Sequence, residues 1–521
     1  MKKYSWRKIV FFVSAALLLS ALMTYGYMYG KLIKNNERFD GFSAGSEALV
    51  TSGMIAEMRE IKSEYPIGYY GTALNVSNRK LKGYEYYKNV MFGMTNGEYD
   101  DGYSKNNPGE ILLGLTVDAN NIYENAAYAE FANGQRLNVR DVFADENWIY
   151  IYMDTEEIMS SKTFGRLIDA KFYNSEGEII HIDGYSPYKS CVGLQGTLFR
   201  AFTKFFKAES VFGISNLFCS IALSVVFVAI SFFIWKKYNL TAGICFYLVM
   251  LFSPIITNFA RNLYWVEFTW FIPVLAGLVC SVYINNKNIR VVMYPVVFIS
   301  VFFKCLCGYE YISTILIAAM SFMFADFIQA IVKKDTEFSK KLFKTMCIMG
   351  IAAVLGFFTA LIVHSYMRGG SIYSGIKDIW YNDVLRRTFG GTAEQFGDAY
   401  SDSINATVSQ VVKLYLAPEY DIVAGMSASY FKILMLLPVF AFIYDKAVLK
   451  QNDIRTAVMY FLCFIAAISW FVLAKSHSYE HTHLNCAMWY FGFVQICFYA
   501  PLNSLVKTVK SIMGHKQKVS L

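Results

Sequence analysis

Charged residues are scarce in this sequence. They make up 17% of its 521 residues, while hydrophobic residues make up 55%. An average soluble protein contains about 25% charged residues. A chain with so few charges lacks the polar surface of a soluble globular protein. Its hydrophobic residues gather in long runs, which is typical of an integral membrane protein.

Motifs for nucleotide binding are missing as well. The sequence has no GxxxxGK[ST] loop and no GxGxxG after an expected strand, and it also lacks the HExxH pattern of zinc peptidases. Direct use of ATP is therefore not expected. The net charge of +8 is modest, and Lys and Arg lie mainly beside the apolar runs. This distribution indicates membrane orientation and argues against nucleic acid as a partner.

Cysteines in exposed positions are few. Most of the ten cysteines lie inside apolar runs, where they behave as small hydrophobic residues. Cys191 and Cys486 are the two that we expect to be exposed, so the sequence allows one disulfide bridge but no disulfide framework.

Ten apolar runs are long enough to cross a membrane. The first run is about 21 residues long and lacks a small-x-small cleavage site, which favours an uncleaved span over a signal peptide. The sequence therefore predicts a polytopic α-helical membrane protein with about ten transmembrane helices. The runs are 9–29, 211–234, 239–259, 264–284, 291–309, 312–332, 344–364, 430–446, 456–474 and 486–505.

The distribution of basic residues gives the orientation. With the N-terminus inside, every inner segment is rich in Lys or Arg, as the positive-inside rule requires. We therefore expect a multi-pass protein of the plasma (cytoplasmic) membrane with both termini cytoplasmic. The inner segments are 236–237, 285–290, 333–344, 445–455 and 507–518.

This topology divides the chain into five parts. They are the N-terminus with the first span (1–30), an extracytoplasmic domain (31–208), spans two to seven (209–364), an extracytoplasmic loop with surface helices (365–429), and spans eight to ten with the cytoplasmic tail (430–521).

The segment 31–208 is polar enough to fold as a domain of its own. It opens with an expected helix at 43–61, capped by Ser43 or Ser46. Strand-like runs follow, and the last two flank a Gly-containing hairpin loop at 174–178. The sequence thus predicts an extracytoplasmic β-rich domain, an α/β fold or β-sandwich, between the first and second spans. The strand-like runs are 111–117, 148–153, 167–173 and 179–182.

Four charged residues lie at the outer ends of neighbouring spans: Arg261, Glu267, Lys304 and Glu310. A charge in hydrocarbon costs at least about 2.5–3.5 kcal/mol on insertion scales, so retained charges usually have a function. We expect these four to converge on one cavity that binds substrate. The alternative is two structural ion pairs, or cations that reach the headgroups.

Three of the six histidines follow the ninth span: His477, His481 and His483. His477 and His481 are four residues apart and share one face if the helix continues. A divalent metal site is conceivable there, but ligands from one short segment are a weak signal, and we assign no metal. Hydrogen bonding to a sugar or phosphate, or an ordinary hydrated loop, are the competing interpretations.

Two carboxylates lie just beyond the first span, Asp40 and Glu47. A general base that deprotonates a sugar hydroxyl needs a carboxylate held beside the acceptor. An ordinary helix start is the simpler interpretation, because acidic residues favour the first turn.

The overall layout resembles the C-type (GT-C) integral-membrane glycosyltransferases, with a first span, a large outer loop and many further spans. This resemblance implies transfer of a sugar from a polyprenyl-phosphate donor to a glycan acceptor on the outer face of the membrane. It implies Asp40 or Glu47 as the catalytic acid of the first loop. It also implies that Arg261 and Lys304, with Arg386 and Arg387 of the second loop, hold the lipid phosphate.

Other membrane functions remain open. A transporter or flippase of lipid-linked glycans would also place charges in a central cavity, extending into the inner half of several spans. Beyond Asp326, the sequence shows no such charge. A polysaccharide polymerase would have outer loops rich in Arg, for which Arg386 and Arg387 are only a hint. A sensory receptor would need a cytoplasmic output domain, and every inner segment is short.

Overall fold

A computed structural model gives the structure of the chain. It describes residues 6–34, 36, 38–39, 42–58, 66–74, 110–116, 125–130, 136–144, 148–154, 171–180, 184–388, 391–397 and 400–519. Asp40, one of the two predicted catalytic residues, lies outside the described residues.

Long apolar helices dominate the described part of the chain. Seven helical segments there are long and apolar enough to cross a membrane, and an eighth span is formed if one bent pair is counted. The chain is thus a multi-pass helical membrane protein. The seven helices are α1 (Trp6–Tyr29), α7 (Ala208–Lys237), α11 (Lys287–Cys307), α12 (Ile312–Val332), α13 (Thr336–Gly369), α18 (Phe431–Ala447) and α19 (Ile454–Leu473).

The bent pair is α8 (Leu240–Phe252) and α9 (Pro254–Ala260), which meet at 69°. Ser253 separates them and accepts a hydrogen bond from the backbone of Ile256, so it caps the second helix. Pro254 occupies the first turn of that helix, where its missing N–H costs nothing, and it cannot continue the helix before it. The expected span 239–259 is therefore broken in the middle.

Two further expected spans do not form a helix that is both long and apolar enough to cross a membrane. The run 264–284 forms α10 (Phe268–Val282), which is about 22 Å long and too short for a hydrocarbon core of about 30 Å. The run 486–505 begins with a 3-10 turn at Cys486–Tyr490 and continues as α22 (Phe493–Val519). The expected number of about ten spans is therefore higher than the seven or eight that the described residues contain.

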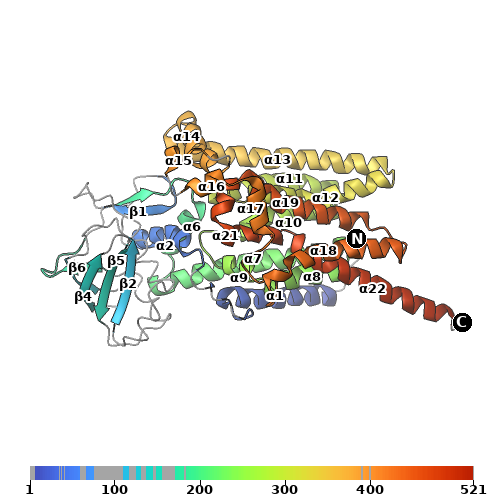
Figure 1. The fold of residues 1–521 in the computed structure, drawn as a ribbon, viewed down its shortest axis with the longest axis horizontal. Helices are drawn as coiled ribbons and strands as arrows, with labels where there is room; N and C mark the ends of the chain where they lie inside the picture. Colours follow the sequence, from blue (N-terminus) through green and yellow to red (C-terminus); the bar gives the residue numbers. More distant parts are fainter. Residues whose placement is uncertain are drawn as a thin grey trace.

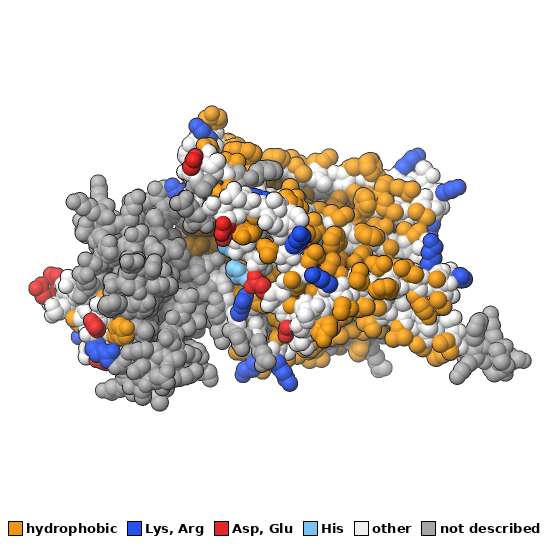
Figure 2. All heavy atoms as spheres, in the orientation of Figure 1, with side chains coloured by type: hydrophobic (Ala, Val, Ile, Leu, Met, Phe, Trp, Pro, Cys, Tyr) orange, Lys and Arg blue, Asp and Glu red, His pale blue; other side chains and the backbone are white. Residues whose placement is uncertain are grey.

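The spans form one bundle around α12, which packs against α10, α13 and α19. The start of α1 and the end of α22 lie at the same end of the bundle, and the β-strands lie at the opposite end (Figure 1). Hydrophobic side chains cover most of the helical region on the face shown in Figure 2, and Lys and Arg side chains cluster at the end away from the strands. This pattern fits a bundle surrounded by lipid.

Strands occupy parts of the segment between α1 and α7. One antiparallel sheet has the order β2-β5-β4-β3-β6, and a two-stranded sheet pairs β1 with β7. The pairing of β1 with β7 brings together the beginning and the end of this segment. The strands are β1 (Tyr70–Leu74), β2 (Glu110–Thr116), β3 (Ala126–Glu130), β4 (Arg136–Ala144), β5 (Trp148–Asp154), β6 (Lys171–Asn174) and β7 (Gly184–Pro187).

Several local expectations for this segment can be compared with the described residues. The predicted helix 43–61 is α2 (Ala44–Met58). Residues 181–182 of the expected strand 179–182 lie outside the described residues, and Ile179 forms an isolated bridge with Tyr173. The hairpin loop is present, because the backbone of Asn174 donates to Glu178 at 2.9 Å and Gly177 has a φ of 79°. Large parts of 31–208 lie outside the described residues, so these strands alone do not establish a β-rich domain.

Short helices complete the end of the bundle near the strands. They connect the long helices and carry most of the polar groups discussed below. They are α6 (Leu194–Phe202), α14 (Ile372–Ile379), the π-helix η1 (Trp380–Leu385), α15 (Ala393–Phe396), α16 (Ser401–Asn405), α17 (Val408–Tyr415), the 3-10 turn η3 (Ala428–Tyr430), α20 (Lys475–Glu480), α21 (Thr482–Asn485) and the 3-10 turn η4 (Cys486–Tyr490).

All ten cysteines are free. Cys191 and Cys486, expected to be exposed, are buried, with 2% and 3% of their surface accessible. The bridge that the sequence allows between them is not formed, because both thiols are free. Both thiols are covered because the loops that carry them pack onto the end of the bundle, so they contribute as small apolar groups.

Candidate functional site

A cavity of about 320 Å³ lies beside the start of α12. Its walls come from α12, α13, α14, η1, α19 and α20, and most of them are apolar. We call it the Arg387 cavity. Its lining residues are Ser190, Tyr309, Glu310, Ile312, Ser313, Phe357, Leu361, Ile376, Ile379, Trp380, Asp383, Val384, Arg387, Thr388, Trp470, Leu473, Ala474 and His477.

A network of charges, most of them at least partly buried, lies along one wall of this cavity. The Arg387 guanidinium lies 3.7 Å from Glu310 and 3.3 Å from Asp383. Arg368, from the last turn of α13, bridges Asp383 and Asp378. Burial acts to lower the pKa of Arg387, but Tyr188, Asp383 and Glu310 outweigh it and raise the pKa above its usual value. Arg387 is therefore a permanent cation held between two carboxylates.

The π-helix η1 positions this network. It follows α14 directly and contains Asp383, while Arg387 lies one turn further on. π-Helical turns are rare and often occur at functional sites. Trp380, the first residue of η1, lines the cavity and still exposes 53% of its surface.

His477 lines the same cavity from α20. Burial lowers its pKa well below the usual value, and the charges of His481 and Arg387 act in the same direction. The imidazole is therefore neutral at about pH 7. Its ring lies edge-on to that of Trp470, with centroids 6.0 Å apart.

The other two histidines extend away from the cavity. The ring centroids of His477 and His481 are 4.6 Å apart, and those of His481 and His483 are 5.9 Å apart. Within the described residues, no three His, Cys, Asp or Glu side chains are arranged to hold a metal ion. The three histidines are thus neighbours, as their spacing predicted, but only His477 lines the cavity.

Three polar atoms in the cavity wall have no hydrogen-bond partner among the described residues. They are Ser190 Oγ, Tyr309 Oη and Trp470 Nε1. Buried polar groups are normally paired, and an unpaired group often indicates an unseen ligand or water. A polar ligand or a water molecule in contact with these atoms would satisfy them.

Of the four charges expected to converge, Glu310 alone lines the Arg387 cavity. Arg261 packs at 4.0 Å over the ring of Phe39 and donates to the carbonyl oxygens of Met28 and Phe39. Lys304 is 2% exposed and donates to the carbonyl of Gly308 at 2.6 Å. Lys304 therefore caps the end of its own helix.

Glu267 and Arg386 also lie outside the cavity lining. The Arg386 guanidinium lies 4.9 Å above the ring of Tyr400. Its charge nevertheless acts on His477 and His481, so it is close to the polar end of the cavity. Glu267 is fully buried in the turn between α9 and α10 and is considered below.

Glu47, the second predicted catalytic residue, has structural contacts. Its Oε1 accepts from the backbone of Leu263 at 3.0 Å and from Asn216 Nδ2 at 3.2 Å. It is 7% exposed and does not line the Arg387 cavity. These bonds fix α2 to the turn that follows α9 and to α7.

Several residues of this region were not singled out in the sequence. Asp383 and Arg387 are four residues apart, and an i, i+4 acid–base pair on a short helix is a readable signal. Arg368 comes from another helix, so no spacing reveals it. Gln195 is a third case: its Nε2 donates to the carbonyls of Tyr264 at 2.6 Å and Cys307 at 2.9 Å.

The stretch 41–45 also matches the GxSxG pattern of serine hydrolases. Ser43 precedes α2 with a φ of 51°. Its Oγ accepts a hydrogen bond from Trp265 Nε1 at 2.7 Å. No histidine among the described residues donates to it or accepts from it, so the match lacks the base that a serine nucleophile needs.

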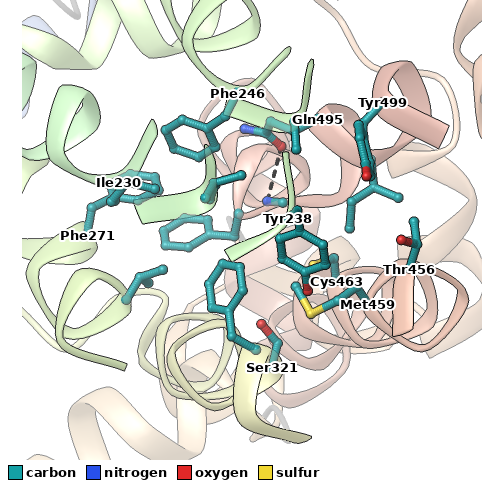
Figure 3. Close-up of a pocket in the computed structure, with 17 residues that line it drawn as sticks. Ile230, Tyr238, Phe246, Phe271, Ser321, Thr456, Met459, Cys463, Gln495 and Tyr499 are labelled. Carbon is teal, nitrogen blue, oxygen red and sulfur yellow. Dashed lines mark hydrogen bonds between the residues drawn. The ribbon is translucent and has the colours of Figure 1, made fainter. Parts of the chain in front are cut away.

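A second cavity, of about 60 Å³, lies inside the bundle, and we call it the Gln495 cavity (Figure 3). No charged side chain lines it among the described residues. The Gln495 side chain accepts from the backbone of Gly492 at 3.1 Å. Tyr238 Oη and Thr456 Oγ1 lack a partner within the described part of the chain. The remaining walls are mainly apolar, as expected for a packing void.

The chain matches no protein-family model, no curated protein and no solved structure.

Proposed function

We propose that the chain is a membrane glycosyltransferase. It transfers a sugar from a polyprenyl-phosphate donor to a cell-envelope glycan or a lipid-linked acceptor on the outer face of the membrane. The observation that carries this proposal is the Arg387 cavity, which combines apolar walls with a charged end. A lipid-linked sugar has the same division into a long apolar chain and a polar head.

The rim of the cavity supports a lipid ligand. Ile376, Trp380 and Leu473 line the cavity and are also 43%, 53% and 50% exposed. Exposed apolar side chains at an opening are stable where the opening faces lipid rather than water. A polyprenyl chain can therefore leave the cavity along an apolar surface.

Arg387 is the residue that we propose for the donor phosphate. Its two carboxylate partners fix the guanidinium, and within the described part of the chain no further hydrogen bond occupies its N–H donors, which can bind phosphate oxygens. A fixed cation at the place where charge develops on the leaving phosphate stabilises the transition state.

Glu310 and Asp383 are our candidates for the general base. Both line the cavity beside Arg387, whereas Glu47 is engaged by Leu263 and Asn216 elsewhere. A carboxylate next to the acceptor hydroxyl can take its proton as the new glycosidic bond forms. His477, a neutral imidazole at the same end, can hydrogen-bond to sugar hydroxyls.

The topology belongs to the same proposal. The termini are cytoplasmic, the protein lies in the plasma membrane, and 31–208 forms an extracytoplasmic β-rich domain. Single cysteines introduced at Ser175 and Lys340, compared with the parent protein, test the sidedness. A reagent that cannot cross the membrane should label the first and not the second. Labelling of the second alone contradicts the proposed orientation.

Transfer itself is tested with the protein reconstituted in liposomes with polyprenyl-phosphate sugars. E310Q or D383N should lower the transfer rate by about 10²-fold, the scale of general-base catalysis. E419Q is the matched control, because Glu419 is paired with Arg38 outside the cavity. E47Q and D40N test the two residues that the resemblance implies.

The outcomes separate the candidate functions. Full activity in both E310Q and D383N contradicts the assigned site. Lipid-linked glycan that crosses the bilayer without being consumed indicates a flippase instead. Joining of preassembled repeat units, without use of single sugars, indicates a polysaccharide polymerase.

A further inference from the structure

Glu267 is a buried carboxyl group that the proposed sugar transfer does not use. It lies in the turn between α9 and α10 and has 0% of its surface exposed. Neither carboxyl oxygen has a hydrogen-bond partner among the described residues, and no described Lys, Arg or His forms an ion pair with it. An ionised carboxylate in such surroundings is strongly disfavoured.

Two other carboxyl groups are also buried, but they are paired. Glu47 is 7% exposed and accepts hydrogen bonds from Leu263 and Asn216. Glu310 is 8% exposed and pairs with Arg387. Burial alone therefore does not distinguish Glu267. The difference lies in the missing partners, which leave a bound proton as the only means of neutralising the carboxylate in the described structure.

The surroundings of Glu267 carry unusual backbone geometry. Val266, directly before it, has a φ of 37°, and Tyr311, at the start of α12, has a φ of 66°. A positive φ at a β-branched residue is rare. Strained residues of this kind persist only where the surrounding structure imposes them, and they cluster at functional sites.

Two tyrosines lie close enough to Glu267 for its charge to act on them. They are Tyr27 from α1 and Tyr311 from the segment before α12. Tyr27 Oη donates to the carbonyl of Met250 at 3.0 Å. Tyr311 Oη and the nearby Thr269 Oγ1 have no partner in the described part of the chain. A neutral carboxylic acid is compatible with these groups, whereas a carboxylate would face no cation among the described residues.

We propose that Glu267 is a proton-binding site inside the bundle, occupied at neutral pH, and that it is a modification site for hydrophobic carbodiimides. The proposal is independent of sugar transfer. In the reaction the carboxyl proton moves to one carbodiimide nitrogen, and the carboxyl oxygen bonds to the central carbon. An acyl shift from oxygen to nitrogen then gives a stable N-acylurea. No atom leaves, so the protein gains the mass of one carbodiimide.

The first test is labelling of the full-length protein in detergent with dicyclohexylcarbodiimide, followed by peptide mass spectrometry. The peptide containing Glu267 should carry the label at about pH 7. The peptide containing Glu47 is the internal control and should stay unmodified, because two donors stabilise its ionised form. Equal labelling of both peptides, or labelling of Glu47 alone, overturns the proposal.

The second test does not depend on access of the reagent. A carboxyl that holds its proton in the folded state but releases it in the unfolded state destabilises the fold as pH rises above the ordinary value of about 4.3. E267Q keeps the shape without the titration. Its melting temperature should therefore exceed that of the wild type by a margin that grows from about pH 5 to about pH 8. E47Q, the matched control, should show no growing margin. A constant margin for E267Q means that the proton is not held, whatever the labelling shows.

Discussion

The two ends of α12 carry buried charges that are arranged differently. At its start, Glu310 pairs with Arg387 beside a cavity of about 320 Å³. Near its last turn, Asp326 pairs with Lys237 and lies 3.5 Å from Arg455. Both groups combine carboxylates with cations in a membrane protein, where an isolated charge is costly. The contrast lies in what surrounds them.

The Asp326 group is closed. Ser281 donates to Asp326 at 3.2 Å, and Lys237 donates to the carbonyl of Ser281 at 3.3 Å, so α7, α10 and α12 meet there together with α19. The Lys237 and Asp326 side chains are 10% and 5% exposed. Because these charged groups pair with one another, we infer that their role is to hold the four helices together. The Arg387 network borders a hollow whose wall holds three polar atoms without a hydrogen-bond partner among the described residues, which leaves capacity for a ligand.

The Asp326 group also matters for the alternative that the protein is a transporter. It requires charges in the inner half of several spans, and Lys237, Asp326 and Arg455 come from three different helices. They are nevertheless paired with one another, and none of them lines either of the two cavities. This arrangement favours a structural role for the Asp326 group.

The largest expected effect follows from breaking the closed group. D326N leaves Lys237 buried without its counter-charge, and we expect a loss of about 3–5 kcal/mol in the free energy of unfolding. Denaturation in detergent micelles measures it. The double variant K237M/D326M is the control and should recover much of the loss, because an apolar pair needs no compensation. A D326N variant as stable as the wild type would contradict a structural role.

The next effect concerns the open network. R387M removes the proposed phosphate ligand and should weaken binding of a polyprenyl phosphate by about 10- to 100-fold, the scale of a charge-assisted hydrogen bond. Equilibrium binding to the purified protein measures this loss. R386M is the control, since Arg386 lies over Tyr400 outside the cavity. Equal losses in both variants would mean that general positive charge, not the cavity, attracts the lipid.

The third prediction concerns the pH dependence of stability that arises from His481, near the Arg387 cavity. Burial, with the charges of His483 and Arg387, lowers the pKa of His481 to about 4. The ordinary value is about 6.5, so the unfolded state binds more protons than the folded state between these two values. Above about pH 6.5 His481 does not reduce the free energy of unfolding. As the pH falls toward about 4, it lowers the free energy of unfolding by up to about 1.4 kcal/mol per pH unit.

H481Q should remove this part of the acid sensitivity. The melting temperature of the variant relative to that of the wild type, measured between about pH 7 and about pH 4, should rise as the pH falls. H483Q is a useful comparison, because His483 faces Glu419, whose charge opposes the effect of burial on its pKa. Parallel pH curves for H481Q and wild type would show that the folded protein does not exclude the proton from His481.

The sequence was sufficient to predict the helical membrane fold, because an apolar run of about 20 residues matches the length of a membrane-spanning helix. The prediction from sequence overestimated the number of spans, because the hydropathy of a run does not show where a helix within it begins or ends. Ser253 and Pro254 divide one run, and α10 begins only after Glu267. Burial of Cys191 depends on how its loop packs on the bundle, which no local pattern reveals.

The candidate site was predictable only in part. Glu310, Arg387 and His477 were selected by their charge and position, and all three line one cavity. Lys304 has the same sequence features, but its ammonium group binds the carbonyl of Gly308 in its own helix end. Whether a charge at the end of a span faces a ligand or its own backbone depends on side-chain direction, which spacing does not determine. Asp383 was missed because a π-helix in a long loop has no hydrophobic period.

The smallest expected effect extends the comparison to the two cavities, one beside the charged network and one inside the bundle. The Gln495 cavity is an apolar void of about 60 Å³ without charged lining, so filling it should stabilise the bundle without affecting function. V274I adds one methylene at its wall and should raise the free energy of unfolding by roughly 0.8 kcal/mol, while the transfer rate stays unchanged. V384I, at the wall of the Arg387 cavity, is the matched control, because the same added group there takes space from the proposed ligand. Loss of transfer in V274I with normal transfer in V384I would reverse the assignment of the two cavities.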